Sequence, residues 1–351
     1  MNGGHKNGHT ACALGAQKGT VVVPKKCPFC CTEVFTPMAT PINQTRTDAK
    51  RKPRWLARTT AGAAATMVAA YGGMAISVDH SALTALEGLF LYLVGLGAAT
   101  IANSTGVGGG VVFLPAFEFL GANGHIAIVA GQIVGMSFII QSFGMSTGSL
   151  RWLHRIHDAR GTDTGVPPAV FLRMLALVLG CALPAMLATQ ALHTSPPEAV
   201  LWAFKAVSVG LGMLVLVTSW LGRGRAQNRS HPTGVDYAAL AGLSLIGGVA
   251  TAFFSVGVGE LVALYLFVRN FPLVTTAALA VIASAVSVLF GVWDHLLSTP
   301  QPWDILLYVV PGAITGGFIA RPFAEMLGPF RLKIFAASWI TLSSAYLLFL
   351  A

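Results

Sequence analysis

The sequence contains few charged residues for its length. Among 351 residues, charged side chains make up 10% and hydrophobic ones 54%, whereas about 25% of the residues in an ordinary soluble domain are charged. Too few polar side chains remain to cover a soluble enzyme of this size or to keep a disordered chain solvated. The composition therefore excludes both classes and indicates an all-α polytopic membrane protein.

Cysteines and catalytic motifs are also scarce. The five cysteines form no disulfide framework, which excludes a secreted disulfide scaffold; they are Cys12, Cys27, Cys30, Cys31 and Cys181. Cys27 and Cys30 make one CxxC pair, but no second pair follows at zinc-ribbon spacing, so a metal or redox role is the minor interpretation. Because HExxH and Walker A motifs are missing from the sequence, we expect no enzyme activity, no cofactor and no nucleotide-driven pump.

Apolar runs occupy most of the chain after residue 80. They cover 83–102, 107–121, 125–148, 168–191, 199–221, 237–254, 259–269, 273–293, 303–325 and 332–350. Most approach the roughly 20 residues that cross a bilayer, but 107–121 and 259–269 are short, and each follows a glycine-rich break. Unwound backbone is tolerated in a membrane only where protein buries it or where it lines a cavity. The two breaks are therefore the first places to look for a binding site.

The chain divides into five predicted parts. Residues 1–58 are polar and then basic, which predicts a disordered cytoplasmic tail, and the Ala-rich run 59–80 predicts an extra N-terminal transmembrane helix, with a signal peptide as the alternative. The rest is predicted as a first membrane repeat over 83–221, a cytoplasmic linker over 222–236 and a second membrane repeat over 237–351.

The basic residues predict the topology. The net charge of +9 does not indicate nucleic-acid binding, because Lys and Arg cluster in short loops between apolar runs. If all eleven segments cross from a cytoplasmic N-terminus, the basic residues of the connections fall on the cytoplasmic side: Arg151, Arg155, Arg160, Arg223, Arg225, Arg229, Arg269, Arg331 and Lys333. The other connections contain no Lys or Arg. We therefore expect a plasma (inner) membrane protein with its N-terminus inside and its C-terminus outside.

The two breaks share a motif. Residues 104–108 and 255–259 both read S-x-G-V-G, at an offset of 151 residues. Each motif lies in a unit of five segments, and because five is odd, the two units enter the membrane from opposite sides. The pattern predicts an inverted repeat of two five-segment helical units with short broken helices, an architecture of many secondary transporters. Chance similarity of glycine-rich membrane segments is the alternative.

These residues resemble the TauE/SafE family of sulfite and organosulfonate exporters. The resemblance rests on Gly106-Val107-Gly108-Gly109-Gly110 with Pro115 shortly after, and on Gly257-Val258-Gly259, within a match of about residues 83–350. The sequence departs from the family pattern at Glu260, where glycine is usual, and the family's Thr-Ser-like pair is missing near Gly131-Gln132 and Leu279-Ala280. The resemblance implies export of a small sulfur-containing anion.

A small anion at the membrane midplane needs hydrogen-bond donors. A helix N-terminus offers free N–H groups and partial positive charge, and glycine lets backbone approach a ligand closely. We therefore predict a site between helix N-termini at Gly108 and Gly259, with close helix packing as the alternative role of the glycines. The candidate substrate-binding residues are Asn103, Ser104, Thr105, Gly106, Gly108, Gly109, Gly110, Gln132, Ser255, Gly257 and Gly259. Other polar neighbours on the following helices are Ser137, Gln141, Ser284 and Ser287.

Two charged residues are candidates for coupling. Glu260 lies at the second break, where a protonated carboxyl could donate a hydrogen bond and carry a proton; a wetted position at the outer mouth is the alternative. Lys205 lies inside an apolar segment and could attract the anion. Arg173 and Arg321 lie near helix ends, where long basic side chains extend to the interface.

The sequence thus predicts a secondary transporter for a small inorganic or organic anion, driven by protons or by the substrate gradient. The lipid bilayer is its surroundings, nucleic acid is not expected as a partner, and a homodimer is one assembly left open. The alternative is a membrane scaffold or assembly protein that uses the Cys-containing N-terminal tail; a membrane-embedded enzyme ranks below it.

Overall fold

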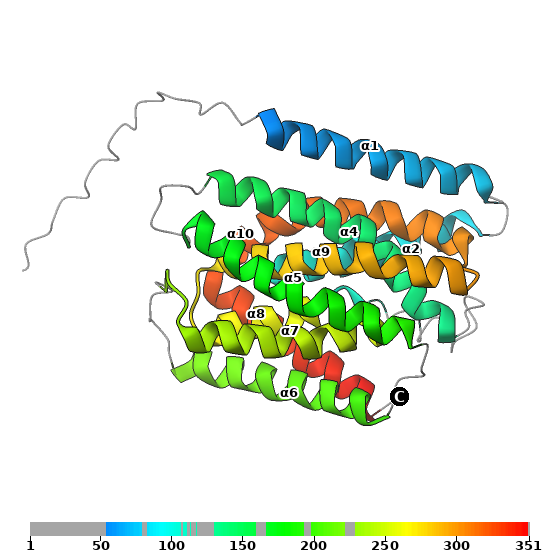
Figure 1. Cartoon of the computed structure of the whole chain (residues 1–351). Coiled ribbons are helices and arrows are strands. Elements are labelled where there is room, and N and C mark those ends of the chain that lie inside the picture. Colours follow the sequence, from blue (N-terminus) through cyan, green and yellow to red (C-terminus); the bar gives the residue numbers. More distant parts are fainter. Residues whose placement is uncertain are drawn as a thin grey trace, which may run out of the picture. The chain divides into compact units, whose positions relative to one another are not determined.

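The computed structural model describes residues 54–78, 83–106, 108–110, 113, 117, 130–158, 166–192, 198–221 and 229–349. Within these ranges the protein forms helices and no strands (Figure 1). The named helices are α1 (Arg54–Ser77), α2 (Ala85–Thr105), α4 (Ala130–Asp158), α5 (Pro168–Ala191), α6 (Glu198–Leu221), α7 (Gly234–Phe254), α8 (Val258–Val268), α9 (Leu273–Ser298) and α10 (Trp303–Phe349).

Most helices lie where the apolar runs predict them, and the differences have local causes. α4 and α9 continue beyond the apolar runs at their C-terminal ends, because polar residues can extend a helix once they reach the interface. The runs 303–325 and 332–350 form two helices, as predicted, that share the label α10 and meet at a kink at non-helical Gly328, with φ 71°. Most of the predicted segment 107–121 lies outside the described residues.

Six of the described helices are long and apolar enough to cross a membrane: α2, α4, α5, α7, α9 and α10. The short α8 is apolar as well. α1 forms, but it begins at Arg54 rather than at residue 59, so residues 54–58 are helical instead of belonging to a disordered tail. Buried Leu56 explains the earlier start, because its side chain packs into the protein. α1 is not among the candidate spans, so its length and composition do not support the predicted membrane crossing over 59–80.

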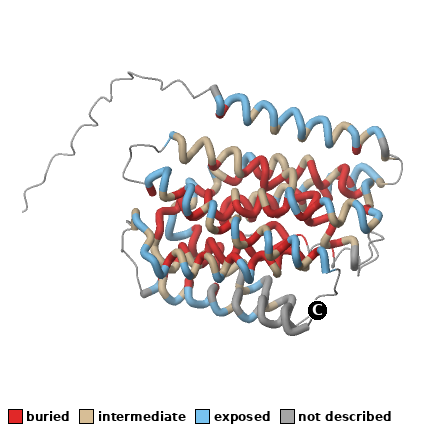
Figure 2. The backbone as a smooth tube through the Cα atoms, in the orientation of Figure 1, coloured by how far each residue is buried: buried red, intermediate tan, exposed pale blue. Residues whose placement is uncertain are grey.

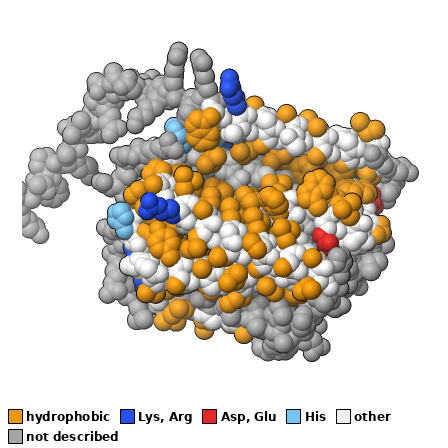
Figure 3. All heavy atoms as spheres, in the orientation of Figure 1, with side chains coloured by type: hydrophobic (Ala, Val, Ile, Leu, Met, Phe, Trp, Pro, Cys, Tyr) orange, Lys and Arg blue, Asp and Glu red, His pale blue; other side chains and the backbone are white. Residues whose placement is uncertain are grey.

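The surface has the distribution of charge expected of a chain that spans a bilayer. Hydrophobic side chains cover the middle of the face in Figure 3, the visible Lys and Arg side chains lie toward the left ends of the helices, and the acidic ones lie toward the right. Large apolar side chains such as Leu86, Leu172 and Trp293 are well exposed. In water they would be unfavourable, whereas in lipid they are in a matching solvent.

Glycines allow the helices to pack closely. α2 packs against the first part of α10, where a Cβ at Gly95 would meet the carbonyl oxygen of Val309 and one at Gly312 would meet that of Tyr92. α7 packs against α5 in a similar way, with Gly248 against the carbonyl oxygen of Ala182. Such small-residue contacts are typical of membrane helices, because burial of apolar surface drives little association in lipid.

α4 and α9 pack against each other at the centre of the bundle, and most of their residues are buried (Figure 2). α10 also packs against α4, and α5 packs against α9. In contrast, α1 is largely exposed along its length (Figure 2). The buried centre of the bundle therefore comes from helices after residue 84, and the glycine breaks reach it from α2 and α7.

We predict that Gly95→Ala destabilises the protein and that Gly97→Ala does not. The new methyl group at position 95 meets Val309 backbone, whereas nothing lies within 4 Å of a Cβ at Gly97 on the same helix. The overpacking costs about 1–3 kcal/mol, against a gain of up to about 1 kcal/mol from helix propensity at both positions. Thermal unfolding in detergent checks the difference. Equal midpoints for the two variants would contradict this packing.

Candidate functional site

Both breaks begin with a helix that ends in a left-handed residue. α2 ends at Gly106, with φ 79°, and α7 ends at Ser255, with φ 57°. In each case the cap N–H donates to the carbonyl four residues earlier, at Ala102 and Thr251 respectively. Glycine adopts this conformation at little cost, whereas a serine there is strained and needs surrounding contacts to hold it.

A glycine starts the helical turn after each break. The carbonyl of Gly257 accepts from the N–H of Leu261 at 3.0 Å, and that of Gly109 accepts from Phe113 at 2.9 Å. Gly257 has φ 152° and is packed against the carbonyl of Gly247. The helix starts therefore lie at Gly109 and Gly257, within two residues of the predicted Gly108 and Gly259.

The two breaks touch each other. A Cβ at Gly108 would lie 3.3 Å from Val256 Cα, and one at Gly259 would lie 2.6 Å from the carbonyl oxygen of Gly106. Backbone of the first break is thus packed directly on backbone of the second, although about 150 residues separate them in sequence. Both Gly108 and Gly259 are buried. The structure thus brings the two breaks into direct contact.

Gln141 of α4 joins the two breaks. Its side-chain carbonyl accepts from the N–H of Gly109 at 2.9 Å, and its amide donates to Ser255 Oγ at 2.7 Å and to the Ser255 carbonyl at 3.0 Å. The amide also donates to Ser137 Oγ, one turn earlier, at 2.9 Å. Gln141 is 2% exposed, so these bonds replace water for backbone groups that no helix satisfies.

The structure does not bring Gln132 to the breaks. Its amide is near the other end of α4 and donates to the carbonyl of Pro300 at 2.9 Å. Nine residues separate Gln132 from Gln141, which is about two and a half helical turns, so the two side chains leave α4 on opposite faces. A further signal favours Gln141: it shares a helix face with Ser137, Gly144 and Gly148, the small residues that admit a close neighbour.

The hydroxyl groups before the first break are bonded within their own helix. Ser104 and Thr105 both donate to the carbonyl of Ile101, at 2.9 and 2.8 Å. Asn103 donates from its amide to the carbonyl of Ala99, and its side chain is packed against Gly148. All three side chains are fully buried. In this arrangement they shape the end of α2 rather than offering donors to a ligand.

The remaining predicted residues have mixed outcomes. Glu260 is fully buried in the first turn of α8, which contradicts the alternative of a wetted outer-mouth residue. Gly110 is buried at the start of the turn after the first break. Lys205 belongs to α6, but its side chain lies outside the described residues, and so does the Cys27–Cys30 pair. Arg173 is exposed, and Arg321 pairs with Glu325 at 3.2 Å.

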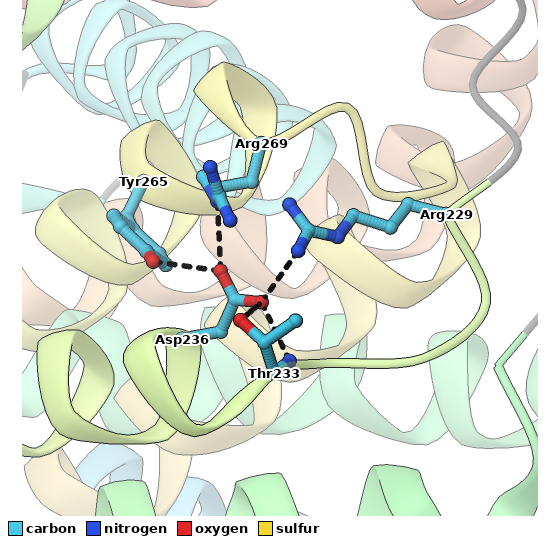
Figure 4. Close-up of polar contacts among 5 residues, drawn as sticks. All are labelled: Arg229, Thr233, Asp236, Tyr265 and Arg269. Carbon is cyan, nitrogen blue, oxygen red and sulfur yellow. Dashed lines mark hydrogen bonds and ion pairs between the residues drawn. The ribbon is translucent and has the colours of Figure 1, made fainter.

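The far end of α8 is held by a buried carboxylate that sequence reasoning missed. Asp236, in the first turn of α7, is fully buried and accepts from Arg269 Nε at 2.7 Å and from Tyr265 Oη at 2.8 Å (Figure 4). Arg229 approaches its second oxygen at 3.0 Å, and Thr233 donates to that oxygen from both its N–H and its hydroxyl. Every lone-pair direction of the carboxylate is thus used, which is what a buried charge requires.

Asp236 also completes a helix cap. Thr233 and Asp236 form a capping box at the start of α7, and Thr84 and Glu87 form the same box at the start of α2. The two boxes differ in surroundings, because Glu87 is exposed, whereas Asp236 is covered by two arginines. The T-x-x-acid spacing was the sequence signal for the carboxylate. We refer to the two touching breaks, the one after α2 and the one after α7, as the crossed breaks. α8 is consequently fixed at its start by the crossed breaks and at its end by Asp236.

The comparison with known families identifies the chain. The family model for the sulfite exporter TauE/SafE matches residues 91–347. The chain belongs to this family. It is a multi-pass membrane transporter and not an enzyme. The match covers both breaks, α8 and the Asp236 cluster, but it leaves out α1. The chain matches no curated protein and no solved structure.

We predict that Asp236→Asn lowers the free energy of unfolding by about 1.5–3 kcal/mol, because it removes the charge from the buried side chain that two partly exposed arginines contact. Glu87→Gln is the matched control: glutamine keeps the equivalent capping box at an exposed position, so only the charge is lost, at a cost below about 1 kcal/mol. Thermal and denaturant unfolding in detergent measure both. If the two variants lose equal stability, the arginine contacts of Asp236 do not hold α8.

Proposed function

We propose that the protein is a secondary transporter that carries a small anion, such as sulfite or an organosulfonate, through a midplane site at the two crossed breaks. The single observation that carries the proposal is the contact between the breaks. α8 has 11 residues, about 17 Å of helix at about 1.5 Å per residue, which reaches only half way across a hydrocarbon core of about 30 Å. Its start therefore lies at mid-depth beside the first break.

An inverted repeat is the architecture that we assign to the two halves. Four observations support it: the length of α2 and α7, their capping boxes, their left-handed ends and their packing. α2 and α7 each have 21 residues, begin with a Thr-x-x-acid capping box and end in a left-handed residue. The packing is reciprocal as well: α2 packs on α10 as α7 packs on α5, and α10 packs on α4 as α5 packs on α9. The helix ends pair Gly106 with Ser255, so the repeat has a register of 149 residues here instead of the 151 of the shared motif.

The membrane orientation follows the basic residues. We place in the cytoplasm the helix ends that carry Arg151, Arg155, Arg269 and Arg321. The N-terminus then lies inside a plasma (inner) membrane and the C-terminus outside it. In that orientation the Asp236 cluster closes the cytoplasmic end of α8. The start of α8 then faces the membrane interior, where its N–H groups and partial positive charge favour an anion.

Glu260 is the residue that we assign to proton coupling. It occupies the first turn of α8, so its ionised carboxylate takes the place of an anion at the positive end of the helix. Protonation removes that competing charge and lets the substrate bind, which couples the movement of a proton to that of the anion. Lys205 of α6 remains a second candidate for attracting the anion.

Flux of radiolabelled sulfite into proteoliposomes, with and without a pH gradient, tests the coupling. We expect wild type to transport sulfite and the gradient to accelerate it. Glu260→Gln should abolish only the accelerated part, because glutamine cannot exchange a proton, whereas Glu87→Gln, at an exposed position, should leave both parts unchanged. A full pH response in Glu260→Gln would exclude Glu260 as the proton carrier.

A second pair of variants separates substrate binding from packing at the breaks. Gly108→Ala adds a methyl group 3.3 Å from the backbone Cα of Val256, a tight contact, so we expect a modest loss of stability but at least about tenfold slower flux, as small displacements in a site can cost. Gly291→Ala, seven residues beyond Ser284 on α9, meets the ring of Phe138 at 2.7 Å. It should lower the unfolding midpoint while folded protein transports normally. If Gly108→Ala transports like wild type, the glycines serve packing alone.

The alternative function, a scaffold that uses the Cys-containing tail, makes a different prediction. Removal of residues 1–51 should leave transport unchanged, because the crossed breaks lie after residue 100. Absence of flux for sulfite and for a panel of sulfonates and carboxylates, in folded wild type, would favour the scaffold. Loss of flux on removal of the tail would show instead that the tail takes part in transport.

A further inference from the structure

A cavity lies on the side of α4 that faces away from the breaks. It has a volume of about 360 Å³ and lies between α1, α4 and α10. On α4, Arg151 lines this cavity, whereas the neighbouring Trp152 points the other way and donates to the carbonyl of Asn103 at the end of α2. The cavity is therefore distinct from the crossed breaks. Its α1 wall lies outside the segment that matches the family, residues 91–347.

The cavity is polar at one end and apolar at the other. Thr60 of α1 bonds to His154 of α4 at 3.0 Å, and farther along, Met67 contacts Thr147 and Tyr71 donates to the carbonyl of Leu307. α1 thus runs antiparallel to α4. Its lining residues extend from Thr60 to Tyr71, about 17 Å of helix. The polar end adds Asp158 and Arg321, and the apolar end adds Val68 and Ile314.

Positive charge lies between the two ends. The Arg151 guanidinium stacks 4.6 Å from the centre of the Phe318 ring, and its buried Nε has no hydrogen-bond partner among the described residues. The other charged groups here are largely paired: Arg321 with Glu325, and Asp158 near His157 at 3.9 Å. Arg155 also pairs with Glu325, at 2.8 Å. Among the described residues that line the cavity, Arg151 is therefore the cation without a carboxylate partner.

We propose that this cavity binds an anionic phospholipid, whose phosphate meets Arg151 and whose acyl chain lies along the apolar end formed with α1. An elongated cavity with a basic group at an interfacial helix end and an apolar extension fits an amphiphile, whereas a free small anion would leave the apolar wall unused. The lipid would contact α1, α4 and α10 together. It therefore stabilises the position of α1, which makes few contacts of its own with the other helices. The binding is independent of the proposed substrate site.

The test measures lipid binding to the full-length protein in detergent. Phosphatidylglycerol should raise the unfolding midpoint by several degrees more than phosphatidylcholine, and native mass spectrometry should retain it. Arg151→Gln should weaken phosphatidylglycerol binding about fivefold, the change expected for one cation at a membrane surface. Ala64→Trp, which fills the cavity from α1, should weaken binding of this lipid as well.

Arg173→Gln is the matched control, because Arg173 is an exposed basic residue near the same ends of the helices but outside the cavity. It should bind phosphatidylglycerol like wild type. The unfolding midpoint of each variant is first measured without lipid to show that it folds. If Arg151→Gln fails to fold, Arg151→Lys replaces it; this variant keeps the charge and should retain most of the binding. Equal stabilisation by phosphatidylcholine or by inorganic phosphate would overturn the proposal. Undiminished binding of phosphatidylglycerol in both Arg151→Gln and Ala64→Trp would do so too.

Discussion

The structure depends on satisfying backbone polar groups where helices stop inside a membrane protein. At each break, N–H and carbonyl groups lose their helical partners in a place that water does not reach readily, and each unsatisfied group costs several kcal/mol in hydrocarbon. Gln141 meets this demand for both breaks at once, with bonds to Gly109 and Ser255. One side chain of α4 thereby links two segments from opposite halves of the sequence.

That link has consequences for packing. Because backbone lies on backbone at Gly106 and Gly259, the surrounding helices must present small residues. α9 does so with Ala280 and Ser284, which lie against these two glycines. The two central helices are not equivalent, since α4 bonds to both breaks through Gln141, whereas α9 packs Ala280 and Ser284 against them. A site formed there would be asymmetric even though the two halves are built alike.

Much of the fold could be predicted from the sequence, because apolar runs of membrane length define helices with little ambiguity. The meeting of the breaks was also predictable, from a motif that occurs twice. The side chain that bonds to both breaks was not predictable in the same way. Gln132 and Gln141 are the same residue type on the same helix, and only the small residues that share a helix face with Gln141 distinguish them. The sequence prediction started α1 too late, because the basic composition of residues 50–58 indicates a tail. In the structure the side chain of Leu56 is buried, and the helix extends to include it.

Asp236 shows why a charge at the edge of a predicted span is hard to interpret from sequence. It lies in the first turn of α7, where a capping residue is ordinary, yet it also receives Tyr265 and Arg269 from α8. These partners are close in space because α8 is short and returns its end to the start of α7. The same carboxylate therefore fixes both the entry of α7 and the exit of α8. A short helix that is tied at its far end can hold its N-terminus in place at the membrane interior, and an anion site built from backbone N–H groups needs that fixed geometry.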